Sequence, residues 1–126
     1  VGADEQEAPT SNRQVKWREE VTVGNMEVKN RIGMSPMGTN SAFTNGRKDA
    51  QGIDYFIERA KGGAGIIFMG CQMLNEKIAQ ESMEGYLDSY TVLPFLTSVC
   101  DGMHRYGTKI VCQVSPGTGR NAFPDT

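Results

Sequence analysis

The sequence has no long hydrophobic run, no paired-cysteine motif and no cluster of basic residues. Its apolar runs are far shorter than the roughly 18 to 20 residues that cross a bilayer, so we expect no membrane span. The formal net charge is −2, and 13 Lys and Arg residues are scattered along 126 residues. Because phosphate binding depends on clustered cations, we expect small molecules and proteins as partners, not nucleic acid.

Cysteine and histidine are also scarce. Cys71, Cys100 and Cys112 form neither a CxxC pair nor a metal-ligand spacing. This spacing predicts no disulfide framework and no metal site, and the odd count suggests a reducing compartment, so we expect a cytoplasmic protein. The single histidine, His104, falls near the end of a predicted helix. There a cation interacts favourably with the helix dipole, which favours a structural role over catalysis.

Hydrophobic content of 38% with 22% charged residues is typical of a globular domain. Residues 1–18 begin with small and acidic residues without periodicity, which predicts a disordered leader before a folded part over 19–126. Alternating residues around Gly24-Asn25 predict a β-hairpin over 20–28.

Three short apolar segments are predicted strands, and the second is apolar on both faces, as in a parallel strand that is covered on both sides. They span about 31–34, 65–69 and 109–114, and each ends at Gly, Pro or a lone amide side chain. Because the carboxyl ends of parallel strands meet at one edge, these three ends predict a single ligand site. Lys29-Asn30-Arg31 precedes the first strand, at the opposite edge, and we interpret it as structural.

Helical segments separate the strands. Apolar spacing predicts one helix over 53–60 that stops at Gly62-Gly63, and a second over about 91–107. A long loop is predicted over about 70–90. The order is that of an α/β protein with a parallel sheet, and three strands cannot close a barrel of eight strands and about 250 residues, so we expect an incomplete fold.

Several motifs occur in order along the chain. They are Lys29-Asn30-Arg31-Ile32, Met34-Ser35-Pro36-Met37, Tyr55-Phe56, Glu58-Arg59-Ala60, Gly62-Gly63-Ala64-Gly65-Ile66-Ile67, His104 with Gly107, Gln113-Val114 and Gly119-Arg120. Together they resemble the N-terminal part of the Old Yellow Enzyme family of flavin-dependent ene reductases. The resemblance implies an α/β fold that is the N-terminal portion of a TIM (β/α)8 barrel, a hairpin plus about three βα units. It also implies FMN as cofactor and NAD(P)H as reductant.

The resemblance places five residues at the flavin. Pro36, Met37 and Gly38 would face the isoalloxazine ring, because a stiff exit followed by a residue without a side chain lets the backbone approach closely. Cys71 would offer its backbone to the polar edge of the flavin. Gln113 carries both a donor and an acceptor, which match the adjacent C=O and N–H groups of the flavin pyrimidine. The alternative for Gln113 is a loop amide bonded to local backbone.

Asn40 is a candidate substrate contact, although loop asparagines are more often turn formers. The segment from Gln113 to Arg120 is one residue longer than in the single-domain yellow enzymes. It is closer to the larger enoate and dienoyl-CoA reductases, which implies a 4Fe-4S cluster and FAD in further parts of the protein. No catalytic residue is assigned, because the resemblance places the proton donor and substrate-holding groups on later strands.

Two alternatives stay open. The first is an amine-demethylating dehydrogenase of the same family, and the second is a non-catalytic partial barrel that serves as an interaction subunit. The reductase hypothesis requires the remaining barrel in the same or a second chain, and we expect an oligomer that acts on a small unsaturated substrate.

Overall fold

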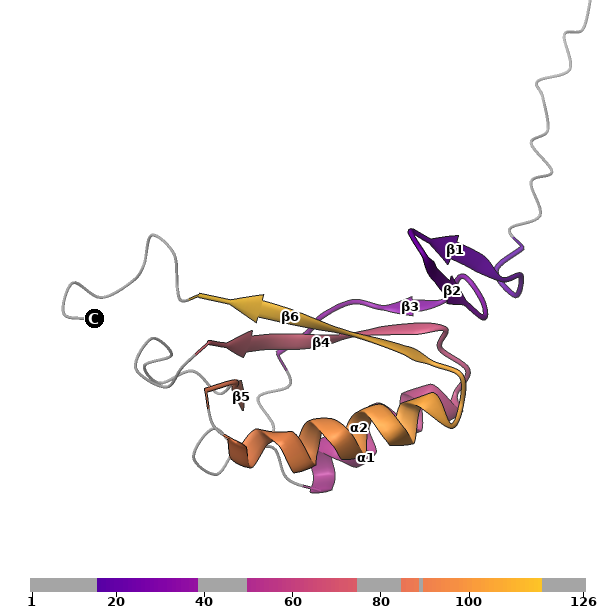
Figure 1. Ribbon diagram of the computed structural model, residues 1–126. Coiled ribbons are helices and arrows are strands. Elements are labelled where there is room, and N and C mark those ends of the chain that lie inside the picture. Colours follow the sequence, from indigo (N-terminus) through magenta and orange to yellow (C-terminus); the bar gives the residue numbers. More distant parts are fainter. Residues whose placement is uncertain (1–15, 39–49, 75–84, 89, 117–126) are drawn as a thin grey trace, which may run out of the picture.

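The computed structural model describes residues 16–38, 50–74, 85–88 and 90–116. In this part of the chain a parallel sheet is covered on one face by two helices, α1 (Ala50–Lys61) and α2 (Leu93–His104) (Figure 1). Of the predicted leader over 1–18, residues 1–15 lie outside the described residues. Residues 16–19 form a turn, and the Arg31 backbone N–H donates to the Trp17 carbonyl oxygen over 2.8 Å.

The predicted hairpin is confirmed. Strands β1 (Val21–Val23) and β2 (Met26–Val28) pair antiparallel, with Val23 opposite Met26. Gly24 has φ of 61°, a left-handed conformation that glycine adopts without a steric cost. The hairpin lies at the amino end of the main strands (Figure 1).

The main sheet is built around β4 (Ile66–Met73). Strand β6 (Lys109–Ser115) pairs with it in parallel along one side. On the other side β3 (Gly33–Met34) pairs with the start of β4, and β5 (Gly85–Tyr86) pairs with its end. The predicted parallel α/β arrangement is therefore confirmed.

Three predicted boundaries were wrong. The first strand covers only 33–34. Before it, the Ile32 carbonyl oxygen accepts from the Gly65 and Ile66 N–H groups, and the Asn30 amide donates to the Gly63 carbonyl oxygen. The second strand runs on past 69 to Met73, so the segment predicted as a loop from Gly70 begins as strand and also contains β5. The second helix is preceded by a 3₁₀ turn, η1 (Tyr90–Val92).

The core lies between the sheet and the helices. Its buried side chains come from three elements: Phe56 and Ala60 of α1, Ile67 and Met69 of β4, and Phe95, Val99 and Met103 of α2. Phe56 and Ala60 lie in the predicted helix over 53–60, and Val99 and Met103 lie in the second predicted helix. The amphipathic spacing that predicted both helices therefore reflects burial against one sheet face.

Side chains at the amino edge tie the hairpin to the later turns, which confirms the structural interpretation of Lys29 and Asn30. The Lys29 ammonium donates to the Tyr106 carbonyl oxygen and, over 3.3 Å, to Thr108 Oγ1. The Asn30 amide donates to the Gly63 carbonyl oxygen over 2.7 Å. These bonds fix the starts of three strands relative to one another.

Candidate functional site

The register between β4 and β6 shifts near their carboxyl ends. Met69 pairs with Cys112, whereas Gln72 pairs with Val114. Two residues of β4 therefore lie opposite a single residue of β6, which is a β-bulge. Bulges disrupt the hydrogen-bond ladder locally, and they are frequent next to active sites.

The residues at the bulge are Gly70 and Cys71 on β4, opposite Gln113 on β6. The structure thus brings together Cys71 and Gln113, two of the five predicted flavin-binding residues, which are 42 positions apart in the sequence. Cys71 does not lie beyond the strand, because β4 continues to Met73. Cys71 is therefore a bulge residue within the strand, and the contact of its backbone with the flavin stays a prediction.

The Gln113 side chain is exposed on the sheet. Among the described residues no hydrogen bond is formed by its amide group, so both the donor and the acceptor face outward unpaired. Gln113 lies within strand β6 and not in a loop, and its contact with the flavin stays a prediction. The arrangement can bind an adjacent C=O and N–H pair on a planar ligand.

Pro36, Met37 and Gly38 follow β3, which is parallel to β4, so they leave the sheet toward its carboxyl edge. All three residues are exposed, and Met37 is 53% exposed. Within the described ranges no hydrogen bond joins them to Cys71 or Gln113. Asn40, the candidate substrate contact, lies outside the described residues.

Gln72 is a polar residue that the sequence analysis did not assign to the site. It is 0% exposed, and its Nε2 donates to the carbonyl oxygens of Gly70 over 2.7 Å and Cys71 over 3.1 Å. Its Oε1 has no partner in the described part of the chain. The signal that could have found it is a lone amide at the end of an apolar run.

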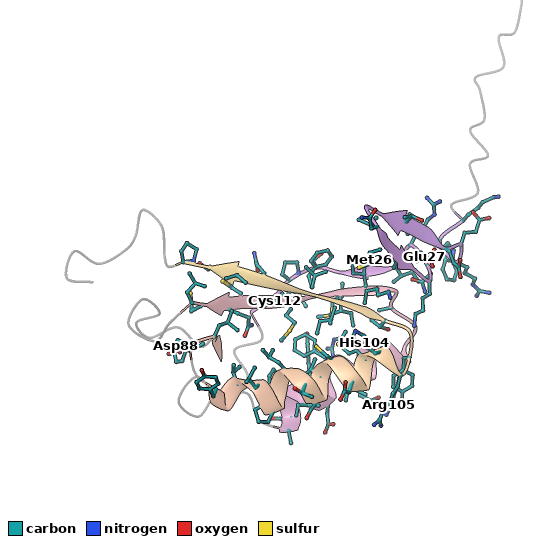
Figure 2. All side chains as sticks on the ribbon, viewed as in Figure 1. Met26, Glu27, Asp88, His104, Arg105 and Cys112 are labelled. Carbon is teal, nitrogen blue, oxygen red and sulfur yellow. The ribbon has the colours of Figure 1, made fainter. Side chains whose placement is uncertain are left out.

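The other titratable candidates lie away from this edge. His104 is exposed at the end of α2, at the opposite end of that helix from Asp88 (Figure 2). Burial raises the pKa of the Cys100 thiol, and the nearby Asp101 carboxylate raises it further. Cys100 is therefore a protonated helix residue at neutral pH, in keeping with a structural role.

An open pocket of about 350 Å³ lies at the start of α2, lined by Leu87, Asp88, Tyr90, Val92 and Leu93. None of the predicted flavin-binding residues lines it. The described residues contain no cluster of acidic, His and Cys side chains that could hold a metal ion. They also contain no helix that is long and apolar enough to cross a membrane.

A parallel sheet with helices on one face is typical of part of an α/β barrel, a fold that binds its ligands at the carboxyl ends of the strands. Comparison with known proteins identifies the family. The sequence profile of the NADH:flavin oxidoreductase / NADH oxidase family matches residues 19–126, and the chain belongs to this family.

Individual relatives agree with this assignment. The chain is 36% identical to cinnamate reductase of Clostridium sporogenes over 111 residues, which cover 82% of this chain and 16% of that protein. The structure is similar to that of 2-naphthoyl-CoA reductase bound to 2-naphthoyl-CoA, with a TM-score of 0.76, 28% identity, and coverage of 86% of this chain and 16% of that one. The chain thus spans about a sixth of the length of these relatives.

A third similarity concerns the fold. The Old Yellow Enzyme from Trypanosoma cruzi superimposes with a TM-score of 0.75 and 21% identity, over 87% of this chain and 29% of that one. The resemblance to the Old Yellow Enzyme family is confirmed. So is the predicted fold class, because the chain has the fold of part of such a barrel.

Proposed function

We propose that the intact protein is an FMN-dependent, NAD(P)H-consuming oxidoreductase of the ene reductase type. The observation that carries this proposal is that Cys71 and Gln113 lie opposite each other at a bulge near the carboxyl edge of the sheet, in a chain that belongs to a flavin oxidoreductase family. FMN, when bound and reduced, supplies a hydride to the β-carbon of an activated C=C bond. The residues of this chain hold and orient the ring.

Gln113 is the central side chain in this proposal. Its amide is exposed and has no hydrogen bond to another described residue, so binding a ligand costs no internal hydrogen bond. An amide donor and acceptor on one planar group match the N–H and C=O of the flavin pyrimidine. Together these two bonds fix the orientation of the ring relative to the sheet.

Cys71 and the segment after β3 complete the proposed cradle. A bulge interrupts the ladder, and we assign the contact with the ligand to the Cys71 N–H, because the Cys71 carbonyl oxygen already accepts from Gln72. Pro36 restricts the backbone conformation where the chain leaves β3, and Gly38 has no side chain to obstruct the flavin ring. The donor set of one side-chain amide and several backbone groups fits the polar edge of a flavin.

Wider aspects of the proposal rest on the relatives. Similarity to cinnamate reductase and to 2-naphthoyl-CoA reductase favours a small unsaturated acid or thioester as substrate over amine demethylation. We further propose that the intact protein carries a 4Fe-4S cluster and FAD, is an oligomer and acts in the cytoplasm. The proton donor is expected outside this chain's described residues, where the remaining strands of the barrel would supply it.

The first test is an intact mass and a visible absorption spectrum of the native protein. Bands near about 370 and 450 nm are expected from bound oxidised flavin. They should bleach with NADH or NADPH without oxygen and return when an unsaturated acid such as cinnamate is added. A colourless protein that stays folded would overturn the proposal and favour a non-catalytic interaction subunit.

A second test uses a matched pair of variants. Gln113→Leu removes the amide at the proposed site, and Gln51→Leu removes an exposed amide on α1. Because each net hydrogen bond contributes about 1 kcal/mol, Gln113→Leu should weaken FMN binding about 10-fold to 100-fold. Gln51→Leu should leave FMN affinity unchanged. Equal FMN affinity in the two variants would remove Gln113 from the site.

A further inference from the structure

Gln72 supports the bulge from the face opposite the proposed flavin. Cys112 and Val114 are two residues apart on β6 and so share a face, and they pair with Met69 and Gln72 of β4. Met69 packs in the core between sheet and helices, which places Gln72 on that helix-facing side. Gln113 lies between Cys112 and Val114 and therefore faces the other side.

The side-chain amide of Gln72 uses both of its donor hydrogens on the bulge. They reach the carbonyl oxygens of Gly70 at 2.7 Å and Cys71 at 3.1 Å. Turning the amide over would place Oε1 against these two oxygens, three acceptors with no donor, so the partners determine its orientation. The cost of this orientation is a buried Oε1 that has no donor among the described residues.

The unpaired Oε1 indicates that Gln72 does not serve mainly to stabilise the core. A buried acceptor without a partner destabilises a protein, whereas an apolar side chain of similar volume would fill the position without this penalty. The apolar residue would, however, leave the two bulge carbonyls without these donors. The amide is therefore suited to hold the bulge and not to fill the core.

The hydrogen bond to Gly70 also determines where a neighbouring donor points. The peptide bond between Gly70 and Cys71 is trans. In a planar trans peptide the C=O of one residue and the N–H of the next point in opposite directions. With the Gly70 carbonyl directed at Gln72, the Cys71 N–H is directed away from the Gln72 amide.

We propose that Gln72 is a positioning residue, which clamps the carbonyls of Gly70 and Cys71 so that the Cys71 N–H is preset for the ligand that Gln113 also binds. This inference rests on the proposed function for the identity of the ligand. The clamp itself is a property of the protein without ligand. The two parts can therefore be tested separately.

The test compares two amide clamps at opposite ends of the sheet in the intact protein. Gln72→Met removes the clamp at the bulge, and Asn30→Leu removes the amide that donates to Gly63 at the amino edge. Three measurements are made on each variant: FMN affinity of the FMN-free protein by fluorescence quenching, hydrogen exchange of peptides covering 70–73, and thermal unfolding.

Gln72→Met should weaken FMN binding about 10-fold, because one backbone donor is misplaced. In the FMN-free protein it should also speed hydrogen exchange of the peptides covering 70–73. Asn30→Leu should lower thermal stability but change neither FMN affinity nor hydrogen exchange over 70–73. Unchanged exchange and FMN affinity in Gln72→Met, or equal losses of affinity in both variants, would overturn the inference. If the unmodified protein binds no FMN, the proposed function fails, and exchange over 70–73 still decides the clamp.

Hydrogen exchange of the Gln72 side-chain amide in the unmodified protein gives a check that needs no folded variant. Selective labelling of glutamine with nitrogen-15 would resolve its NH₂ protons. Both protons should exchange slowly, because both are donated within the interior. Rapid exchange, like that of the exposed Gln113 amide without FMN, would contradict the clamp.

Discussion

Gly65 lies against Asn30 so closely that a Cβ atom at position 65 would be 2.4 Å from Asn30 Oδ1 and 2.8 Å from the Asn30 carbonyl oxygen. The same residue links two strands, since its N–H donates to the Ile32 carbonyl oxygen and its carbonyl accepts from the Lys109 N–H, each over 2.9 Å. Only glycine fits at this junction of the hairpin with β4 and β6.

Gly65→Ala is therefore expected to lower the free energy of unfolding by about 1–3 kcal/mol, the usual effect of overpacking. Thermal or urea unfolding of the intact protein measures this. Gly33→Ala is the control, because its added Cβ would meet the side-chain Ile66 Cγ2 atom at 3.2 Å and the Ile66 carbonyl oxygen at an ordinary contact distance of 3.9 Å. Equal losses of stability in the two variants would contradict the close contact with Asn30.

Thr108→Val should also destabilise the amino edge. Thr108 is 0% exposed, its hydroxyl donates to the Ala64 carbonyl oxygen over 2.7 Å, and it accepts from Lys29. Valine has nearly the same shape but no hydroxyl, so the partly buried Ala64 carbonyl loses its donor at a cost of about 1–3 kcal/mol. Urea unfolding should show that Thr108→Ser, which keeps the hydroxyl, is the more stable variant. If Thr108→Val were the more stable variant, the methyl group of Thr108 would contribute more to stability than its hydroxyl.

Cys71→Ala tests whether the proposed contact with FMN uses backbone or side chain. If the backbone at the bulge binds the flavin, FMN affinity measured by fluorescence quenching should be the same as in the unmodified protein. Gln113→Leu, measured alongside, shows that the assay detects a lost contact. A large loss of affinity in Cys71→Ala would show that the thiol itself takes part.

The raised pKa of the Cys100 thiol predicts its reactivity. Burial and the Asp101 carboxylate both disfavour the thiolate, so the pKa lies above its ordinary value of 9.0. Alkylation of Cys100 by iodoacetamide, followed by peptide mass spectrometry, should be slow at pH 7.5 and should increase with pH beyond 9.0. Asp101→Asn should shift this rise to lower pH. A rate that is already at its plateau at pH 8 would contradict the raised pKa.

The pattern of the residues was sufficient for the main elements but not for their ends. Apolar spacing predicted the buried faces of both helices, and Gly24-Asn25 predicted the hairpin turn. The end of β4 was misplaced because Gly70 and Gln72 resemble loop residues when considered alone. In the structure Gln72 is buried and bonds to its own bulge, a contact that no local propensity encodes.

The sequence alone determined the parallel α/β class, the family and the candidate residues at the strand ends, because periodicity, turn chemistry and motifs depend on residues close together in the chain. Only the tertiary structure decided that Cys71 and Gln113 lie opposite each other at a bulge. It also showed that the buried Gln72 amide donates to the carbonyl oxygens of the two bulge residues, Gly70 and Cys71. The reason is physical: strand register between β4 and β6 depends on packing across two βα units, and a one-residue shift in register changes which residues meet.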